Sequence, residues 1–217
     1  MLLSFAHNLS RYSKLRICST NEHFSGLEPT DIARIRQLSY IKQWQTLRDN
    51  QHYHIRFDDQ SLLLFQNTAG KESFSFLPCP LDVPSQSVFL AERYPDVRPS
   101  KALAYLDDYE LAVLTAEAKT HVTPIRLDSD PTAYRTTIHP VKHLHFGIEN
   151  HIRIATRRSW TPQAFLLFVI RQAYPRNWEI LLERKEDLKI ERWIRGDLPM
   201  IESNYWQVDD ELQHYLS

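Results

Sequence analysis

The stretch HYHIRFDDQSLLLFQNTAGKESFSFL, residues 52–77, decides the fold. It holds three short runs, at 52–57, 61–65 and 72–77, in which apolar residues alternate with polar ones or cluster together. Such runs of about four to eight residues are typical of strands, and short polar links between them favour hairpins. The stretch therefore predicts an antiparallel meander of three strands.

Further extended segments follow this meander along the chain. Residues 120–128 form one, and residues 142–148 form another, which we expect to pair with 151–155 across a short polar turn. Pro124 falls in the first segment and favours an edge or a bulge, because proline donates no ladder hydrogen bond. With the meander, these segments predict an antiparallel sheet of about five to seven strands.

Helical periodicity marks the two ends of the chain. A helix is expected to begin at Glu28 and Pro29, because proline and acidic residues are favoured in a first turn. Thr161 followed by Pro162 is a second start of this kind. The expected helices cover 28–50, 161–174, 178–193 and 209–216, and residues 85–118 also favour a helix.

Together these elements predict one α+β domain over residues 1–217. It has a helical N-terminal part at 1–50, a sheet core at 51–155 and a helical C-terminal part at 161–217. A chain of this length buries roughly 70–75% of its unfolded surface, which suffices for a core without disulfides. The composition, 42% hydrophobic and 12% aromatic, also favours a globular fold over disorder.

The chain has only 4 glycines, where average usage would supply about 15. They stand too far apart to form the glycine-rich loops of P-loop nucleotide hydrolases or Rossmann dehydrogenases, or the G-x-S-x-G turn of α/β-hydrolases. The sequence therefore has no nucleotide cofactor loop, and any bound anion has to be held by side chains.

The two cysteines, Cys18 and Cys79, form no C-x-x-C pair. This pattern fits a reducing compartment and excludes a zinc site built from cysteines. The apolar run at the N-terminus is too short for a signal peptide, and no run approaches the roughly 20 residues needed to span a membrane. We expect a cytoplasmic protein that is not attached to a membrane.

Charge is unevenly distributed, although the whole chain has a net charge of −1. Residues 150–178 contain five arginines and no acidic residue, whereas residues 196–217 contain five acidic residues and no lysine or arginine. The first segment is a candidate anion-binding face and the second a candidate protein interface. The two segments can equally pair with each other.

The chemically densest part of the chain runs from Arg126 to Arg153. Residues two apart on a strand share a face, so His143 and His145 point the same way. Arg126 and Asp128 likewise share one face of their own strand. If the two strands are adjacent, a carboxylate, an arginine and two imidazoles converge.

Three interpretations of this cluster are open. His143 and His145 can act as general acid and base, since imidazole titrates near neutral pH, with Asp128 orienting one ring. They can instead ligate a divalent metal, with His139, Asp128 or His121 as the third ligand. The cluster can also be a structural network that satisfies the polar face of the sheet.

Nearby arginines are candidates for holding the phosphates of a nucleic acid: Arg126, Arg153, Arg157 and Arg158. Together with an acid–base pair of histidines, they predict metal-independent phosphodiester cleavage of the ribonuclease kind. The sequence alone does not choose between this mechanism and a metal-dependent one.

Four motifs resemble those of an uncharacterised family of bacterial proteins of about this length. They are Arg-x-Asp-x-Asp-Pro at 126–131, His-Pro-x-x-His-Leu-His-x-Gly at 139–147, Arg-Ile at 153–154 and Thr-Pro-x-x-Phe at 161–165. The His-Leu-His segment is the most specific of them. The resemblance covers roughly residues 50–175, and residues 1–49 match none of the family's motifs.

The resemblance implies a component of a bacterial anti-phage defence system, because family members occur near mobile elements and phage-defence genes, some beside a helicase gene. The expected function is action on nucleic acid with a helicase as protein partner, with His143 and His145 as the residues of a nuclease. The alternatives are a non-catalytic subunit that binds and regulates the helicase, and a stand-alone toxin ribonuclease.

Overall fold

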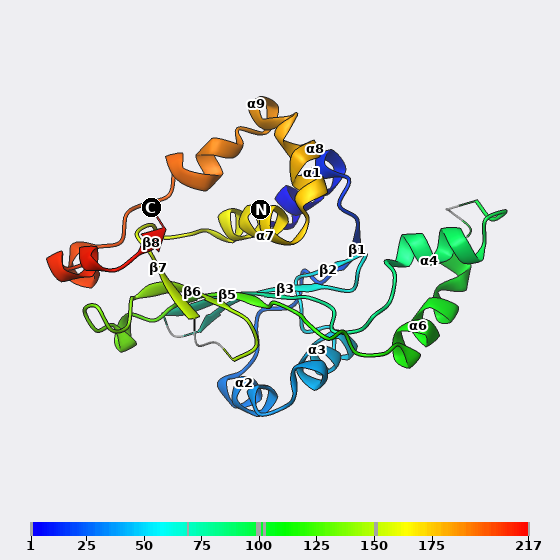
Figure 1. Cartoon of the computed structure of the whole chain (residues 1–217), viewed down its shortest axis with the longest axis horizontal. Helices are drawn as coiled ribbons and strands as arrows, with labels where there is room; N and C mark the ends of the chain where they lie inside the picture. The colour runs from blue at the N-terminus through cyan, green and yellow to red at the C-terminus, as the bar shows by residue number, and fades with distance from the viewer. Residues whose placement is uncertain (1, 69, 99–100, 102, 150–151, 217) are drawn as a thin grey trace.

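The computed structural model describes all residues except 1, 69, 99–100, 102, 150–151 and 217. Within the described residues, eight strands form a single open sheet, ordered along the chain from β1 to β8 (Figure 1). All neighbouring strands are antiparallel except β7 and β8, which are parallel. The predicted α+β class is confirmed, and the sheet is larger than expected.

The strands are β1 (Ile17–Thr20), β2 (Ile55–Phe57), β3 (Leu62–Thr68), β4 (Lys71–Leu77), β5 (Ile125–Ser129), β6 (Lys142–Phe146), β7 (Ile152–Thr156) and β8 (Tyr215–Leu216). The predicted meander is confirmed as β2, β3 and β4, in which Leu63 lies opposite both Ile55 and Phe76. The strand expected at 151–155 is β7, and its expected first residue, His151, lies outside the described residues.

The two outermost strands, β1 and β8, are those that the sequence did not predict. β1 falls in the part expected to be helical. The helix expected at 209–216 is wrong: Val208–Leu212 forms a 3-10 helix, and β8 follows it. These edge strands have only 4 and 2 residues. Strands this short have too few residues to show the side-chain period of two in the sequence. Only their hydrogen bonds to a neighbouring strand define them.

The helices are α1 (Leu2–Ser13), α2 (Pro29–Arg36), α3 (Tyr40–Asp49), α4 (Gln86–Arg93), α6 (Leu106–Thr115), α7 (Pro162–Ala173), α8 (Pro175–Leu182) and α9 (Lys185–Leu188). α7 begins as predicted, because the Thr161 hydroxyl accepts a hydrogen bond from the Ala164 N–H at 3.2 Å. The helical preference of 85–118 is confirmed in α4 and α6. None of the helices in the described part of the chain is both long and apolar enough to cross a membrane.

Two of the expected helices are interrupted. The helix expected at 28–50 is divided into α2 and α3 by a turn at 37–39, which allows Ile35 and Trp44 to enter the same apolar cluster. The helix expected at 178–193 is divided into α8, α9 and a π-helical segment, Arg192–Gly196. Lys189 has a φ of 49°, and this left-handed conformation ends α9.

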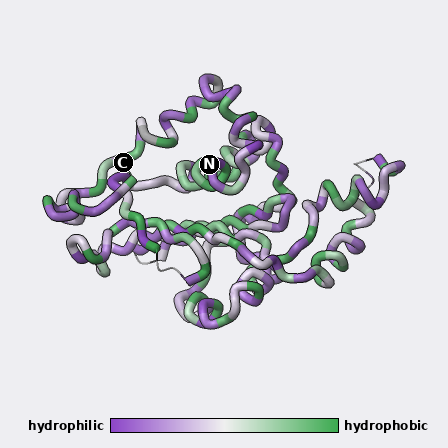
Figure 2. Tube along the Cα trace, in the orientation of Figure 1, coloured by the Kyte–Doolittle hydropathy of each residue, from purple (hydrophilic) through white to green (hydrophobic). Residues whose placement is uncertain are grey.

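One face of the sheet is covered by α1, α7 and α8 (Figure 1). Phe74, Leu127 and Leu144 of the sheet are buried there with Phe165 of α7. Hydrophobic residues recur along these strands and along α7 (Figure 2). This apolar layer is the main core of the protein.

The opposite face of the sheet is apolar in one half only. There, Trp44 of α3 and Tyr109 of α6 pack in one cluster with Leu62 and Leu64 of β3. The half formed by β5, β6 and β7 presents polar side chains instead, and α2 borders it. The sheet therefore offers a polar surface beside a helix, and most of the candidate site residues lie on it.

The segment after α9 is tied to the rest of the protein through Asp210, which is 1% exposed. Its carboxylate accepts hydrogen bonds from the Tyr134 hydroxyl at 2.7 Å, the Thr137 N–H at 2.7 Å and the Gln207 N–H at 2.8 Å. This arrangement, which we call the Asp210 clasp, fixes residues 134–137 just before the site segment.

The basic and acidic segments of the sequence also meet in this region. Arg157 lies over the ring of Trp206 at 4.6 Å and pairs with Glu211 at 3.5 Å. Arg158 donates a hydrogen bond to the Leu198 carbonyl at 2.8 Å. The structure thus supports pairing of the two segments with each other.

We predict that Asp210→Asn lowers the free energy of unfolding at neutral pH by about 2 kcal/mol, because hydrogen bonds to a charged group are lost. Burial raises the pKa of Asp210, but the hydrogen bonds from Thr137, Tyr134 and Gln207 outweigh burial and hold this pKa below its usual value. Since the folded-state pKa is depressed, the contribution is present above about pH 4 and is lost as the pH falls through the folded-state pKa.

Denaturant unfolding of the wild type and of Asp210→Asn at several pH values measures this difference in the free energy of unfolding. The gap between wild type and variant should narrow on acidification. Asp209→Asn is the matched control, because Asp209 is exposed. An equal loss of stability in both variants would contradict the assigned role of Asp210.

Candidate metal centre

The site is built by the alternation of side chains along β5 and β6. Leu127 and Leu144 pair across the two strands and enter the main core. Because the side-chain period of a strand is two, Asp128 and His143 next to them point to the opposite face. Asp128 pairs with His143 in the register, and Arg126 pairs with His145. The predicted convergence of these four residues is therefore present.

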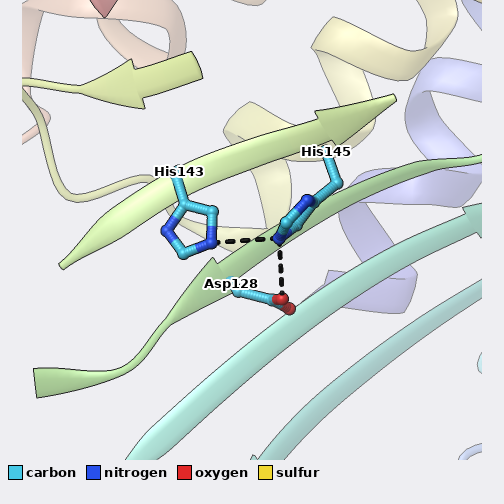
Figure 3. Close-up of side chains that lie close together, drawn as sticks. All are labelled: Asp128, His143 and His145. Atoms are coloured by element: carbon cyan, nitrogen blue, oxygen red, sulfur yellow. Dashed lines mark hydrogen bonds and ion pairs between the residues drawn. The ribbon is translucent and has the colours of Figure 1, made fainter. Parts of the chain in front are cut away.

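Three donor atoms gather at one point on this face (Figure 3). His143 Nε2 lies 3.0 Å from His145 Nε2, and His145 Nε2 lies 3.4 Å from Asp128 Oδ2. Within the described residues, these three form a group whose ligand atoms all lie within 4.8 Å of one another. The two imidazoles are only 2% and 3% exposed, whereas the Asp128 side chain is 20% exposed.

His143 is held in one orientation by its other ring nitrogen. Nδ1 lies 2.9 Å from the Pro140 carbonyl oxygen, which can only accept a hydrogen bond, so Nδ1 carries the proton and Nε2 has a lone pair, which faces His145 Nε2 at 3.0 Å. Burial and the neighbouring His145 lower the pKa of His143 to about 4. At neutral pH this imidazole is therefore uncharged and able to act as a ligand.

Asp128 is kept ionised by the groups around it. Ser73 of β4 donates to Oδ1 at 2.9 Å, and Arg126 donates from Nε at 2.8–2.9 Å to both carboxylate oxygens. Burial raises the pKa of Asp128, but the hydrogen bond from His145 and the charge and hydrogen bonds of Arg126 outweigh it, so this pKa lies well below its usual value. The carboxylate is available as an anionic ligand at any physiological pH.

An open pocket of about 580 Å³ lies over the three donors. Cationic side chains reach it from three directions: Arg36 from α2, Arg126 from β5 and Arg153 from β7. Among the described residues, Arg36 and Arg153 have no ion-pair partner. Partial desolvation and the nearby charge of Arg126 lower the pKa of Arg36. The pocket also holds the acidic residues Glu72, Asp128 and Asp130, but each is paired with a basic side chain, so Arg36 and Arg153 are left to attract an anionic ligand.

The structure separates the predicted site residues into two groups. Arg126, Arg153 and His139 line the pocket. Arg157 and Arg158 do not, because they face the segment after α9 as described above. His139 packs its ring edge against His143, with 4.8 Å between ring centroids, and is not one of the three clustered donors.

His121, the other candidate third ligand, hydrogen-bonds to Thr123 and lies outside the donor group. Sequence reasoning did not find Arg36, Ser73 or Lys71, which also line the pocket. Arg36 belongs to α2, and the other two belong to β4. No spacing along the chain links them to Asp128, so only the folded sheet and the position of α2 bring them together.

The geometry fits a metal centre better than a two-histidine acid–base pair. Two catalytic imidazoles that act on a phosphodiester have to lie on either side of it, but here their Nε2 atoms are 3.0 Å apart and in contact. Metal–ligand bonds of about 2.0–2.1 Å with angles of roughly 90–110° place neighbouring donors about 3.0–3.4 Å apart. Two of the three separations, 3.0 and 3.4 Å, match this spacing, and the third lies within 4.8 Å, so the donors would have to draw slightly closer around an ion.

We predict that the protein binds one Zn²⁺ or Co²⁺ ion per chain through Asp128, His143 and His145. Titration calorimetry with Zn²⁺ and the visible spectrum of the Co²⁺ form measure binding. His145→Ala should lose the site, since it removes one of three ligands. The matched control His121→Ala should keep it. Equal metal binding by both variants would show that the ion is held elsewhere.

Comparisons with known proteins identify the family but no characterised relative. No curated protein and no solved structure matches the chain. A family model described as uncharacterized conserved protein (DUF2290) matches residues 10–199. The match extends beyond the roughly 50–175 region of the resemblance and includes most of the N-terminal part, in which α2 and Arg36 lie. The chain therefore belongs to the DUF2290 family of uncharacterised conserved proteins.

Proposed function

We propose that this protein is a metal-dependent phosphodiesterase that acts on nucleic acid. The observation that carries the proposal is the position of the Asp128, His143 and His145 donor atoms. They gather within 4.8 Å of one another beneath an open pocket, and two of its arginines, Arg36 and Arg153, have no ion-pair partner among the described residues. The three donors can hold a metal ion, and the arginines can bind the charge of a phosphate group.

The ligand set selects the class of metal. Two imidazoles with one carboxylate suit Zn²⁺, Fe²⁺, Mn²⁺ and related ions, whereas Mg²⁺ and Ca²⁺ prefer ligand sets made of oxygen. Three protein ligands leave positions open for water and substrate, which is the arrangement of catalytic rather than structural sites. The hydrogen bond from His143 Nδ1 to Pro140 is of the kind that orients a metal-bound imidazole.

The chemistry follows from this arrangement. A metal held by Asp128, His143 and His145 would lower the pKa of a bound water and polarise a phosphoryl oxygen. Hydrolysis would join a water oxygen to phosphorus and break the bond from phosphorus to the leaving oxygen, and the two protons of the water would go to solvent and to that oxygen. Arg36 and Arg153 stabilise the additional negative charge of the transition state. Arg126 donates to both carboxylate oxygens of Asp128 and would hold this ligand in place.

The biological setting of the proposal comes from the resemblance of the motifs at 126–131 and 139–147. On this basis we propose that the protein works in a bacterium, in an anti-phage defence system with a helicase partner. The two free cysteines, Cys18 and Cys79, are compatible with a reducing compartment. A helicase would supply the nucleic acid on which the metal centre acts.

We predict that the metal-loaded protein cleaves single-stranded oligonucleotides and that His145→Ala lowers kcat by at least about 100-fold, since it removes a ligand rather than an outer contact. Gel analysis of labelled DNA and RNA with Zn²⁺, Mn²⁺ or Co²⁺ measures cleavage. His121→Ala is the control. Copurification with a helicase but no cleavage with any of these ions would instead indicate a non-catalytic subunit.

We further predict that Arg153→Ala raises KM roughly tenfold, because a hydrogen bond to a charged phosphate is lost, while metal affinity is unchanged. Steady-state kinetics and metal titration of the same preparation separate these two effects. Arg176→Ala is the matched control, because Arg176 is exposed and lines none of the described pockets. A loss of metal binding in Arg153→Ala would contradict the assigned role.

A further inference from the structure

A second pocket adjoins the metal centre on the same face of the sheet. Its volume is about 230 Å³, and it lies between the sheet and the helices α2 and α3. Five residues line both pockets, among them Arg36, Gln66 and Arg126. The two pockets are therefore continuous, and two arginines stand at their junction.

The two pockets differ in chemistry. Nearly all the residues that line the pocket over the donors are polar or carry charges of either sign, whereas the adjoining pocket is lined mainly by apolar residues, including Ile35, Tyr40, Leu64 and Ile148. A ligand that fills both needs an anionic group at the junction and a mainly apolar body beyond it. A nucleotide has these two parts in adjacent positions, as phosphate and base.

Hydrogen-bonding groups in the adjoining pocket favour a base over an alkyl chain. Ser75 of β4 and Gln43 of α3 line it. Gln66 lines the junction, and its side-chain nitrogen has no hydrogen-bond partner within the described part of the chain. This nitrogen is buried, so the side chain would have to turn toward the pocket to donate to a ring nitrogen or carbonyl of a base. An alkyl chain offers no such acceptor.

We propose that the adjoining pocket binds an unstacked nucleobase whose phosphate lies between Arg36 and Arg126, and that the substrate is therefore single-stranded nucleic acid. The proposal rests on the phosphodiesterase function above. A base in a paired and stacked duplex cannot enter a pocket between a sheet and two helices, because it has to leave the stack first. Single strands present such bases without the cost of unpairing.

Titration calorimetry of the Zn²⁺-loaded full chain with adenosine 5′-monophosphate and with ribose 5-phosphate tests the proposal. The two probes share the sugar and the phosphate, so any difference reports on the base. We expect the nucleotide to bind at least about tenfold more tightly, since contacts of the base with the pocket lining add to those of the phosphate. Equal affinities would overturn the proposal.

A variant that fills the adjoining pocket tests whether the tighter binding of the nucleotide arises there. Ser75→Leu places a larger side chain in the adjoining pocket without touching the metal ligands. It should remove the advantage of the nucleotide and leave the affinity for ribose 5-phosphate unchanged, whereas the exposed control Ser203→Leu should behave as wild type. Retention of the nucleotide advantage in Ser75→Leu would show that the base binds elsewhere and overturn the proposal.

These measurements separate failure of the base pocket from failure of the proposed function. If single strands are cleaved but the nucleotide has no advantage over ribose 5-phosphate, the phosphodiesterase stands and the base pocket is wrong. If the nucleotide advantage is present and lost in Ser75→Leu but no cleavage occurs, the base pocket stands and the phosphodiesterase is wrong.

Discussion

The alternation of side chains along β5 and β6 is the constraint on which the rest of the structure depends. Leu127 and Leu144 have to enter the core, and the same period of two then places Asp128, His143 and His145 together on the other face. A slip of one residue would bury ionisable groups among phenylalanines and expose the leucines. The energy that holds the core together thus also sets the geometry of the site.

The polar network at the site is costly to bury, and its contacts explain how it is tolerated. Asp128 has partners on three strands, namely Ser73, Arg126 and His145, and Pro140 binds the remaining nitrogen of His143. Removing one partner leaves the others unsatisfied in a poorly hydrated place. A metal would change this balance, because it replaces the contact between the two imidazoles with two stronger bonds.

The part of the site that lies within one local pattern could be predicted from the sequence, and the part assembled from distant elements could not. The i, i+2 spacing of Arg126 with Asp128 and of His143 with His145 was sufficient to predict their common face. The position of Arg36 at the pocket was not predictable. It depends on the turn at 37–39 that separates α2 from α3, and that turn lies within an otherwise continuous helical pattern. The edge strands β1 and β8 were not predicted, because pairing with a neighbouring strand, rather than their own sequence, defines them.

The arginines of the basic segment show the same limit. Arg153, Arg157 and Arg158 look alike in the sequence, but the strand ends at Thr156. Arg153 therefore remains on the sheet beside the pocket, whereas Arg157 and Arg158 turn to the segment after α9. Charge counted along a chain does not distinguish residues that serve a ligand from residues that hold the protein together.

The Asp210 clasp has a consequence for the order in which the protein is completed during synthesis. Asp210 contacts Tyr134 and Thr137, more than seventy positions earlier in the chain. The sheet strands from β1 to β7 leave the ribosome well before it, and domains tend to fold as they emerge. The loop leading to Pro140 has hydrogen bonds of its own, from Asp130 to Val141 and from Arg135 to His139, but it gains those to Asp210 only after that residue has emerged. A growing chain would therefore form the sheet before the clasp, and the loop beside the site would gain its last hydrogen bonds near the end of synthesis.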